Sequence, residues 1–392
     1  MDHSTGLIHH PYRPPDGFES MVEPVHKAST VLFPNVQAMR ERQWNDRSGY
    51  TYGTHGTPST FTLEARIATL EGAQHALLVP SGLAAITLVD MALLRSGDEV
   101  LVPDNAYEPN STFAKVELAA WGIRSSHYNP MDPEDLRRRI TPATRLVWME
   151  AAGSVTLEFP DVPALCEVVR SCQQGRERPV ITALDHTWGS GVAYGPFDWG
   201  VDVAVHALTK YPSGSADLLM GSVSTRDSAL FETLQMAQGR LGLCVAANDV
   251  EAVLRSLPTV HMRYHQADAS TRALAVWMQQ QPQVQQVFHP ALPESPGHDA
   301  WKRNATAAAC LFGVLFKPQF TSEQIDTFCE SLKFFGLGYS WAGPQSLALP
   351  YNVHRLRDLG WPHPGTYVRF AIGLEHVEDL KSDLKQGLQR LA

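Results

Sequence analysis

The sequence predicts an α/β fold, with a large, mostly parallel sheet domain followed by a smaller C-terminal α/β domain. The first observation is length, because 392 residues exceed one ordinary domain and can bury a large core. The second is that short apolar runs alternate with helical stretches between about residues 56 and 255, which is typical of a parallel sheet flanked by helices. The third is a shorter series of such runs after a long helical stretch that begins near residue 256.

Three segments follow from this pattern. Residues 1–55 are rich in Pro, His and Gly and show little periodicity, so we expect an extended arm that does not fold alone. Residues 56–255 should form the large domain, and residues 256–392 the C-terminal domain. Short apolar runs predict strands at Ala76–Val79, Glu99–Val102, Leu146–Met149, Val180–Leu184, Val201–Val205, Gly221–Ser224, Val287–His289, Gly313–Phe316 and Val368–Ala371. Helices are expected over Thr60–Leu70 and Leu83–Leu94, and in the long stretch after residue 256.

A phosphate cradle is predicted where the first strand turns into a helix, at Ser81-Gly82-Leu83. Gly82 permits close backbone approach, and the exposed amides of a helix N-terminus attract anions. A Ser-Gly turn is common, so its value depends on the motifs that follow it along the chain.

Asp185 directly follows the predicted strand Val180–Leu184. A carboxylate at a strand end can reach the crevice where sheet-based enzymes bind ligands, or it can serve as a helix N-cap. For Asp185 alone, both interpretations, a ligand-binding carboxylate and a helix N-cap, remain open.

Lys210 follows the next predicted strand, and no acidic residue stands within six positions of it on either side. Apolar and small neighbours reduce the hydration of an ammonium group, which favours the neutral amine. A neutral amine can form a Schiff base with an aldehyde, although most lysines are solvated surface charges. Pyridoxal phosphate requires such a lysine and an anion against its pyridine nitrogen, and Lys210 and Asp185 on successive strand ends meet both requirements.

Taken together, these motifs resemble the Cys/Met-metabolism family of pyridoxal-phosphate enzymes. The resemblance rests on Ser81-Gly82-Leu83, on Asp185 with Thr187-Trp188, and on Thr209-Lys210-Tyr211, and it runs nearly end to end along the chain. It implies a fold-type I pyridoxal-phosphate transferase-like architecture with pyridoxal 5′-phosphate as the cofactor, bound to Lys210. It implies no metal.

The resemblance also implies roles for individual residues. Tyr107 would stack on the pyridine ring and act with Lys210 in catalysis. The amides of Gly82 and Leu83 and the hydroxyl of Thr209 would bind the phosphate. Tyr52 would reach the phosphate of a neighbouring subunit, which implies a homodimer with shared active sites within a tetramer.

Within the family, the bacterial cystathionine β-lyase branch is the most similar. Tyr107-Glu108-Pro109-Asn110 and Tyr339-Ser340-Trp341-Ala342-Gly343 resemble segments of that branch. Tyr339, Ser340 and Trp341 would then line the substrate site. Arg369, inside an apolar strand, would bind the substrate α-carboxylate, because a buried charge needs an anionic partner.

The implied function is a carbon–sulfur β-lyase that cleaves L-cystathionine or a related cysteine S-conjugate to a thiol, pyruvate and ammonia. A γ-elimination or γ-replacement enzyme for a specialised sulfur amino acid stays open, as does a non-catalytic cofactor-binding or regulatory protein on this fold. Two departures concern the phosphate site: Thr54 stands where the family usually has an arginine, and Ala207 where many relatives have a serine.

Composition limits the classes of molecule that the chain is expected to bind. The net charge of −9 argues against nucleic acid, and no apolar run approaches the ~18 residues that a membrane span needs. The N-terminus lacks a basic region followed by an apolar stretch, and five widely spaced cysteines suggest reduced thiols. We therefore expect a cytoplasmic enzyme whose partners are a small sulfur amino acid and other copies of the chain.

Overall fold

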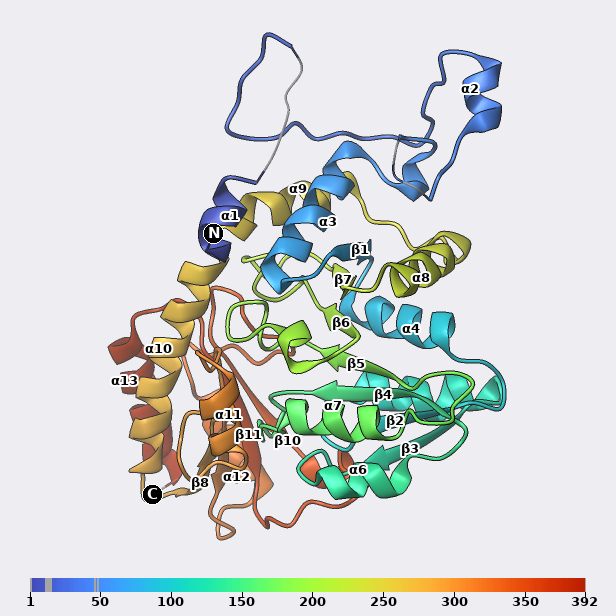
Figure 1. Ribbon diagram of the computed structural model, residues 1–392. Coiled ribbons are helices and arrows are strands. Elements are labelled where there is room, and N and C mark those ends of the chain that lie inside the picture. Colours follow the sequence, from blue (N-terminus) through green and yellow to red (C-terminus); the bar gives the residue numbers. More distant parts are fainter. Residues whose placement is uncertain (1, 11–15, 46, 48, 392) are drawn as a thin grey trace.

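The structure is a computed structural model that describes residues 2–10, 16–45, 47 and 49–391, and it contains a seven-stranded and a four-stranded sheet (Figure 1). The larger sheet has the order β1-β7-β6-β5-β4-β2-β3, and the smaller has the order β10-β11-β9-β8. The strands are β1 (His75–Val79), β2 (Glu99–Pro103), β3 (Arg124–Tyr128), β4 (Thr144–Glu150), β5 (Ile181–Asp185), β6 (Val203–His206), β7 (Gly221–Thr225), β8 (Val284–Phe288), β9 (Leu311–Phe316), β10 (Leu347–Tyr351) and β11 (Tyr367–Ala371). The predicted α/β fold is confirmed.

Helices pack on both faces of the larger sheet because successive strand residues point to opposite faces. Buried residues of α3, α6 and α7 cover one face, and those of α4 and α8 cover the other. The helices are α1 (His3–Ile8), α2 (Val36–Glu41), α3 (Pro58–Glu71), α4 (Gly82–Leu93), α5 (Glu108–Phe113), α6 (Pro133–Arg139), α7 (Val162–Ser171), α8 (Ser228–Leu241), α9 (Ala247–Ser256), α10 (Val260–Gln279), α11 (His298–Asn304), α12 (Ser322–Glu330) and α13 (Val377–Leu388).

Strand direction in the larger sheet determines where the loops meet. Strand β7 runs antiparallel to both of its neighbours, β1 and β6, whereas the pairs from β6 through β5, β4 and β2 to β3 are parallel. The sheet is therefore mostly parallel, as predicted. The carboxyl ends of β1, β2, β4, β5 and β6 all lie at one edge, which is where open α/β sheets bind ligands.

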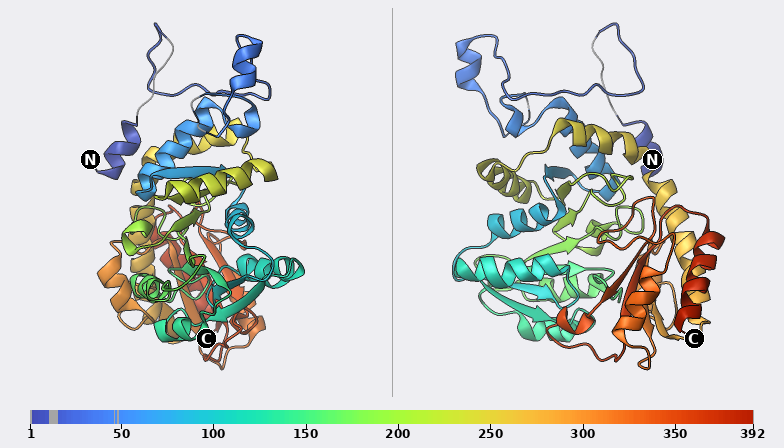
Figure 2. Two further views of the ribbon diagram at one scale, coloured as in Figure 1. Left: turned by 45° about the vertical axis from the view of Figure 1, so that its right-hand side comes forward. Right: turned by 180° about the vertical axis from the view of Figure 1, so that it is seen from behind.

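The smaller sheet is antiparallel throughout. Apolar residues of α10, α12 and α13 pack on one of its faces, and α10 and α13 run side by side along its outer surface (Figures 1 and 2). The opposite face contributes Phe288 and Tyr367, which pack with Val155 from the loop after β4. This second cluster joins the two sheets.

Two strands were not predicted, and both are edge strands. Strand β3 has the polar sequence Arg-Ser-Ser-His-Tyr, and β10 contains Pro350. An edge strand needs no continuous apolar run and tolerates proline, so neither strand gave the expected signal.

The N-terminal arm projects from the body of the molecule (Figures 1 and 2). Helix α1 packs back through Leu7, which is buried, whereas residues 16–45 form a loop with the short helix α2. Apolar arm residues are exposed, among them Phe18, Met21 and Leu32. The two short helices were not predicted for this segment.

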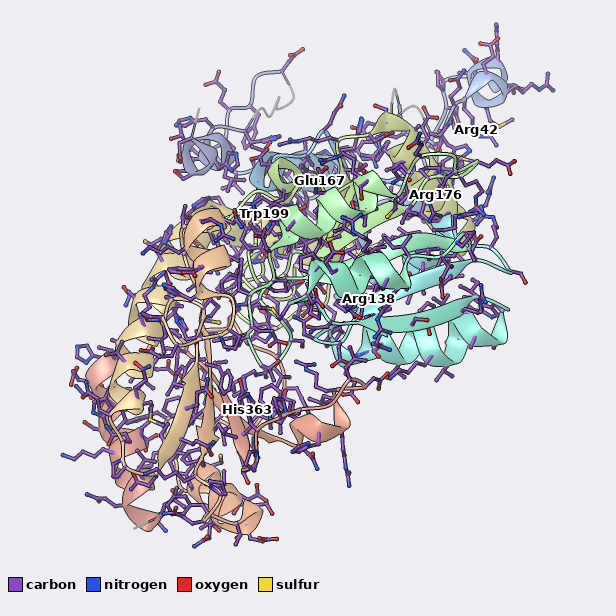
Figure 3. All side chains as sticks on the ribbon, turned by 60° about the horizontal axis from the view of Figure 1, so that its bottom comes forward. Arg42, Arg138, Glu167, Arg176, Trp199 and His363 are labelled. Carbon is purple, nitrogen blue, oxygen red and sulfur yellow. The ribbon has the colours of Figure 1, made fainter. Side chains whose placement is uncertain are left out.

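Charged side chains cover the outer helices of the larger sheet, as Arg138 of α6 and Glu167 of α7 illustrate (Figure 3). All five cysteines are free thiols, in agreement with the prediction. Within the described part of the chain, no helix combines the length and apolar character that crossing a bilayer requires.

Candidate active site

A cleft of about 450 Å³ lies at the carboxyl edge of the larger sheet, beside β11. Its volume is within the range of small-molecule sites. Most of the predicted site residues line it: Gly82, Leu83, Tyr107, Asp185, Thr209, Lys210, Tyr339, Ser340, Trp341 and Arg369. Tyr52 is the exception and lies on the arm.

The parallel strands explain this convergence. Gly82, Tyr107 and Lys210 lie in the segments after β1, β2 and β6, and Asp185 is the last residue of β5. All four therefore lie at the same edge of the sheet. Residues far apart in the sequence therefore face one space.

Lys210 donates a hydrogen bond from Nζ to Ser340 Oγ at 2.7 Å, and its Nζ lies 5.4 Å from the centre of the Trp341 ring. Burial lowers the pKa of Lys210 to about 8, and the nearby Arg369 cation acts in the same direction, whereas Asp185 opposes it. A lysine in this state loses its proton more readily than an ordinary surface lysine.

Arg369 lies on β11 and is only 7% exposed. Its Nη2 donates to the carbonyl of Ser340 at 3.0 Å, and its guanidinium stands 5.2 Å from the centre of the Tyr351 ring. The buried Nε finds no acceptor within the described residues. An unsatisfied guanidinium N–H beside the cleft suits a carboxylate ligand.

Two carboxyl groups lie behind the cleft on neighbouring strands. Asp185 Oδ1 accepts the backbone N–H of Thr187 at 3.0 Å, and Glu150 is its register partner on β4. Burial raises the pKa of Asp185, whereas the hydrogen bonds from Thr187 lower it. Burial, followed by the charge of Asp185, raises the pKa of Glu150 well above its usual range. A protonated ring nitrogen beside Asp185 would offset the cost of burying that carboxylate.

The residues of the predicted cradle lie at the N-terminus of α4. Ser81 caps the helix by accepting the N–H of Ala84 at 3.0 Å, and the first amides of a helix have no intrahelical acceptor. A Cβ at Gly82 would come within 2.6 Å of the Ala207 Cβ, so only glycine leaves this approach free. A phosphate fits such a site.

The hydroxyl of Thr209 has backbone partners of its own. It accepts a hydrogen bond from the N–H of Met220 at 3.1 Å and donates one to the carbonyl of Met220 at 3.3 Å. The cofactor nevertheless fits the site as a whole, because cradle, buried acid and lysine face one cleft.

The two tyrosines differ in position. Tyr107 lines the cleft at 42% exposure, and its backbone N–H donates to Glu150 Oε2 at 2.7 Å. Tyr52 is 46% exposed, and its hydroxyl accepts from Ser29 Oγ at 3.3 Å. Its role toward a neighbouring subunit stays a prediction.

Glu150, Arg357 and Tyr351 are among the cleft residues that were not predicted. Glu150 directly follows a predicted strand, the same signal that identified Asp185. Arg357 donates to the carbonyls of Asp104 at 2.9 Å and Ser154 at 3.0 Å, but its loop shows no recognisable pattern. Tyr351 ends an edge strand that gave no signal.

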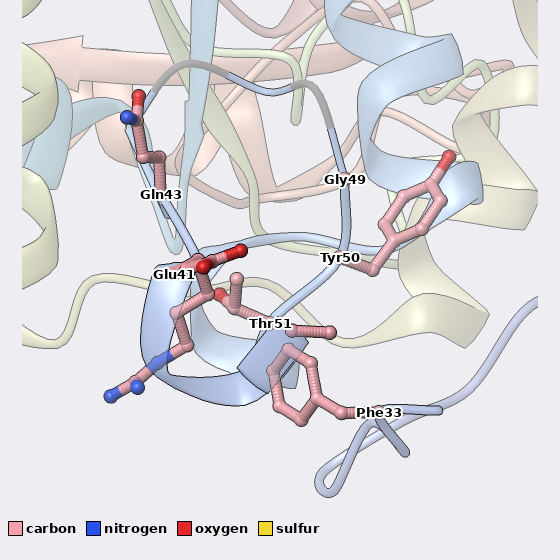
Figure 4. Close-up of a pocket in the computed structure, with 8 residues that line it drawn as sticks. Phe33, Glu41, Gln43, Gly49, Tyr50 and Thr51 are labelled. Carbon is pink, nitrogen blue, oxygen red and sulfur yellow. The ribbon is translucent and has the colours of Figure 1, made fainter. Parts of the chain in front are cut away.

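A second hollow of about 440 Å³ lies on the arm, beside α2 (Figure 4). Phe33, Tyr50 and Thr51 contribute to its lining, and none of the predicted site residues does. It is open and lies apart from the sheet edge.

Known proteins are similar to this chain over nearly its whole length. The family model described as Cys/Met metabolism PLP-dependent enzyme matches residues 4–389. The chain is 34% identical to the cystathionine beta-lyase MetC of Escherichia coli over 94% of this chain and 93% of that protein. It is 34% identical to a cystathionine beta-lyase of Bordetella avium over 100% of this chain and 98% of the relative.

Other relatives have different activities. An L-alanine/L-glutamate racemase of Wolbachia pipientis is 32% identical over 95% of this chain and 93% of its own length. The structure of a cystathionine gamma synthase from Xanthomonas oryzae pv. oryzae, in complex with aminoacrylate and cysteine, superimposes with a TM-score of 0.89 at 25% identity, covering 100% of this chain and 98% of the other.

Proposed function

This chain belongs to the family of Cys/Met-metabolism enzymes that depend on pyridoxal phosphate, and from that premise we propose that it is a carbon–sulfur β-lyase. It would cleave L-cystathionine or a related cysteine S-conjugate to a thiol, pyruvate and ammonia. The observation that carries the proposal is the placement of Lys210 and Arg369 on either side of Ser340, which accepts a hydrogen bond from each.

When bound, the cofactor supplies an electron-accepting ring that stabilises negative charge on the substrate Cα. Asp185 would hold the proton on the ring nitrogen, and Tyr107 would cover one face of the ring. The amides of Gly82 and Leu83 would hold the phosphate. These assignments rest on the cleft geometry and on the family.

The substrate is oriented by its carboxylate. The guanidinium of Arg369 has the unused donor and the planar shape that bind a carboxylate on two oxygens. The Cα–H bond then faces Lys210, whose amine would take the proton as general base. The Cβ–S bond breaks with its electron pair on sulfur, the thiol leaves with a proton, and one water hydrolyses the remaining C3 fragment to pyruvate and ammonia.

Product analysis tests the proposal. The purified holoenzyme is incubated with L-cystathionine and a panel of cysteine S-conjugates, and the keto acids are separated. Pyruvate supports β-elimination, whereas the absence of any keto acid across the panel would contradict the lyase proposal. The Lys210→Ala variant is the control and should yield no product.

A γ-acting enzyme is the second candidate, because the gamma synthase structure superimposes closely on the whole chain. Its signature in the same assay is 2-oxobutyrate instead of pyruvate. Because one relative is a racemase, the optical rotation of L-alanine is also followed, and its loss would indicate racemase activity.

The proposal includes an assembly. Exposed apolar residues on the arm, such as Met21 and Leu32, favour burial against another copy of the chain. We propose a dimer in which Tyr52 completes the neighbour's site, within a tetramer. The cytoplasmic location stays a prediction from composition.

A further inference from the structure

The charged side chains that line the cleft are three acids and three bases: Glu108, Glu150, Asp185, Lys210, Arg357 and Arg369. The bases set how many anionic groups of a substrate the cleft can neutralise, because a carboxylate that leaves water without a partner is strongly disfavoured.

Each of the three bases already has a partner or a role. The side chain of Arg357 is 4% exposed and is bonded to the carbonyls of Asp104 and Ser154. Lys210 is assigned to the cofactor and Arg369 to the α-carboxylate. No cation among the described lining residues is left for a second carboxylate on the substrate.

The remaining wall is aromatic and aliphatic. Leu219 and Tyr339 are 68% and 80% exposed, and Tyr351 and Leu356 line the same cleft. The acid at this rim is Glu108, which is exposed. Glu108 and Tyr351 line the same cleft. Burial raises the pKa of Tyr351, the Arg369 cation opposes this, and the charges of Tyr339 and Glu108 act with burial.

The part of the arm that is expected to reach a neighbour's site is the segment around Tyr52. Arg42, whose charge acts on His55 of this segment, donates to the Met39 carbonyl of its own arm. Residues 49–60 contain Tyr52 and Thr54 but no lysine or arginine. The basic residue of this segment is His55, and burial, with Arg42 acting in the same direction, lowers its pKa. This shift disfavours the charged form of His55.

We infer that the enzyme prefers cysteine S-conjugates whose leaving thiol is uncharged, and that it discriminates against leaving groups that end in a carboxylate. L-cystathionine, whose leaving homocysteine carries a carboxylate, then belongs to the poorer substrates of the proposed lyase. The inference rests on the proposed β-lyase activity and names the substrate class of that site. Apolar contact with the rim would bind an uncharged thiol, whereas a terminal carboxylate would meet Glu108 and no cation.

The test compares two conjugates of nearly equal shape. S-(2-carbamoylethyl)-L-cysteine and S-(2-carboxyethyl)-L-cysteine differ by an amide and a carboxylate at the same position. Pyruvate release by the holoenzyme should give a kcat/KM at least about tenfold higher for the amide, because charge complementarity at a binding site controls selection. The Glu108→Gln variant should raise kcat/KM for the carboxylate conjugate by about threefold and so narrow the ratio between the two conjugates.

Glu177→Gln is the matched control, since Glu177 is an exposed acid that does not line the cleft. Equal values for the two conjugates, or a preference for the carboxylate, would overturn the inference while the lyase activity stands. If neither conjugate, nor any other in the panel, yields pyruvate, the proposed function fails and the inference falls with it.

Discussion

At the scale of single residues, the cleft works by placing opposed charges where water is scarce. Burial and the charge of Arg369 lower the pKa of Lys210 to about 8, and burial raises the pKa of Asp185. Both shifts favour the neutral form of the group, the amine of Lys210 and the carboxyl of Asp185. A cofactor that is an aldehyde at one end and a protonated ring nitrogen at the other would pair with both groups.

The pKa of Lys210 gives a test by pH. The amine captures an aldehyde only when neutral, so capture by cofactor-free protein should rise between about pH 7 and 9 and then level, whereas an ordinary lysine would keep rising toward pH 10.4. Borohydride reduction followed by peptide mapping measures the label on Lys210 at each pH. Because Arg369 lowers the pKa, Arg369→Gln should move the midpoint upward. Label on a different lysine would refute the assignment of Lys210.

The role of Asp185 is tested by replacing its carboxylate with an amide. Asp185→Asn keeps the shape but cannot hold the ring nitrogen protonated, so kcat should fall about hundredfold or more while the protein stays folded. Absorbance of the bound cofactor and the thermal midpoint check loading and folding. Asp202→Asn is the control, since burial also raises the pKa of Asp202 but this residue precedes β6 at the opposite end of the strand. Near-normal turnover of Asp185→Asn with full cofactor would show that the ring lies elsewhere.

At the scale of elements, the site is an edge of a parallel sheet. Strands with apolar runs could be predicted from the sequence because strands that are buried on both faces are rich in apolar residues. That is why Asp185 and Lys210, just beyond such strands, were identifiable. Arg357 could not be found, because its position depends on a loop that long-range contacts with Asp104 and Ser154 hold in place.

The cradle gives a prediction at this scale. Gly82→Ala would bring a Cβ within 2.6 Å of the Ala207 Cβ and force the start of α4 away from the loop after β6. Cofactor affinity should fall at least about tenfold, because the helix amides lose their positions, with a stability loss of about 1–3 kcal/mol. Equilibrium dialysis of the cofactor and urea unfolding measure the two effects.

Gly6→Ala is the matched control for the cradle. Gly6 lies in α1, where an added Cβ meets a Thr69 methyl at an ordinary 3.5 Å. It should leave cofactor affinity unchanged. Equal affinity of Gly82→Ala and the wild type would remove the cradle from the site.

At the scale of the whole molecule, the arm is the part that the isolated chain leaves unexplained. Several of its apolar residues, such as Phe18, Met21 and Leu32, are exposed, and the segment with Tyr52 does not line the cleft of its own chain. Composition predicted a segment that cannot fold alone, but neither composition nor periodicity could state what covers it. The proposed second copy of the chain would account for both the exposed side chains and the position of Tyr52.

Mixing two defective proteins tests that arrangement. Lys210→Ala and Tyr52→Phe each disable every site of their own dimer. If Tyr52 serves the neighbour's site, a mixed dimer contains one site with both residues intact, and activity should recover to about one quarter of the wild type on statistical mixing. If Tyr52 serves its own site, no mixed dimer contains an intact site and activity stays at the level of the parents. Tyr50→Phe is the control, because Tyr50 stacks on Phe61 of the same chain at 5.5 Å and should keep full activity without mixing.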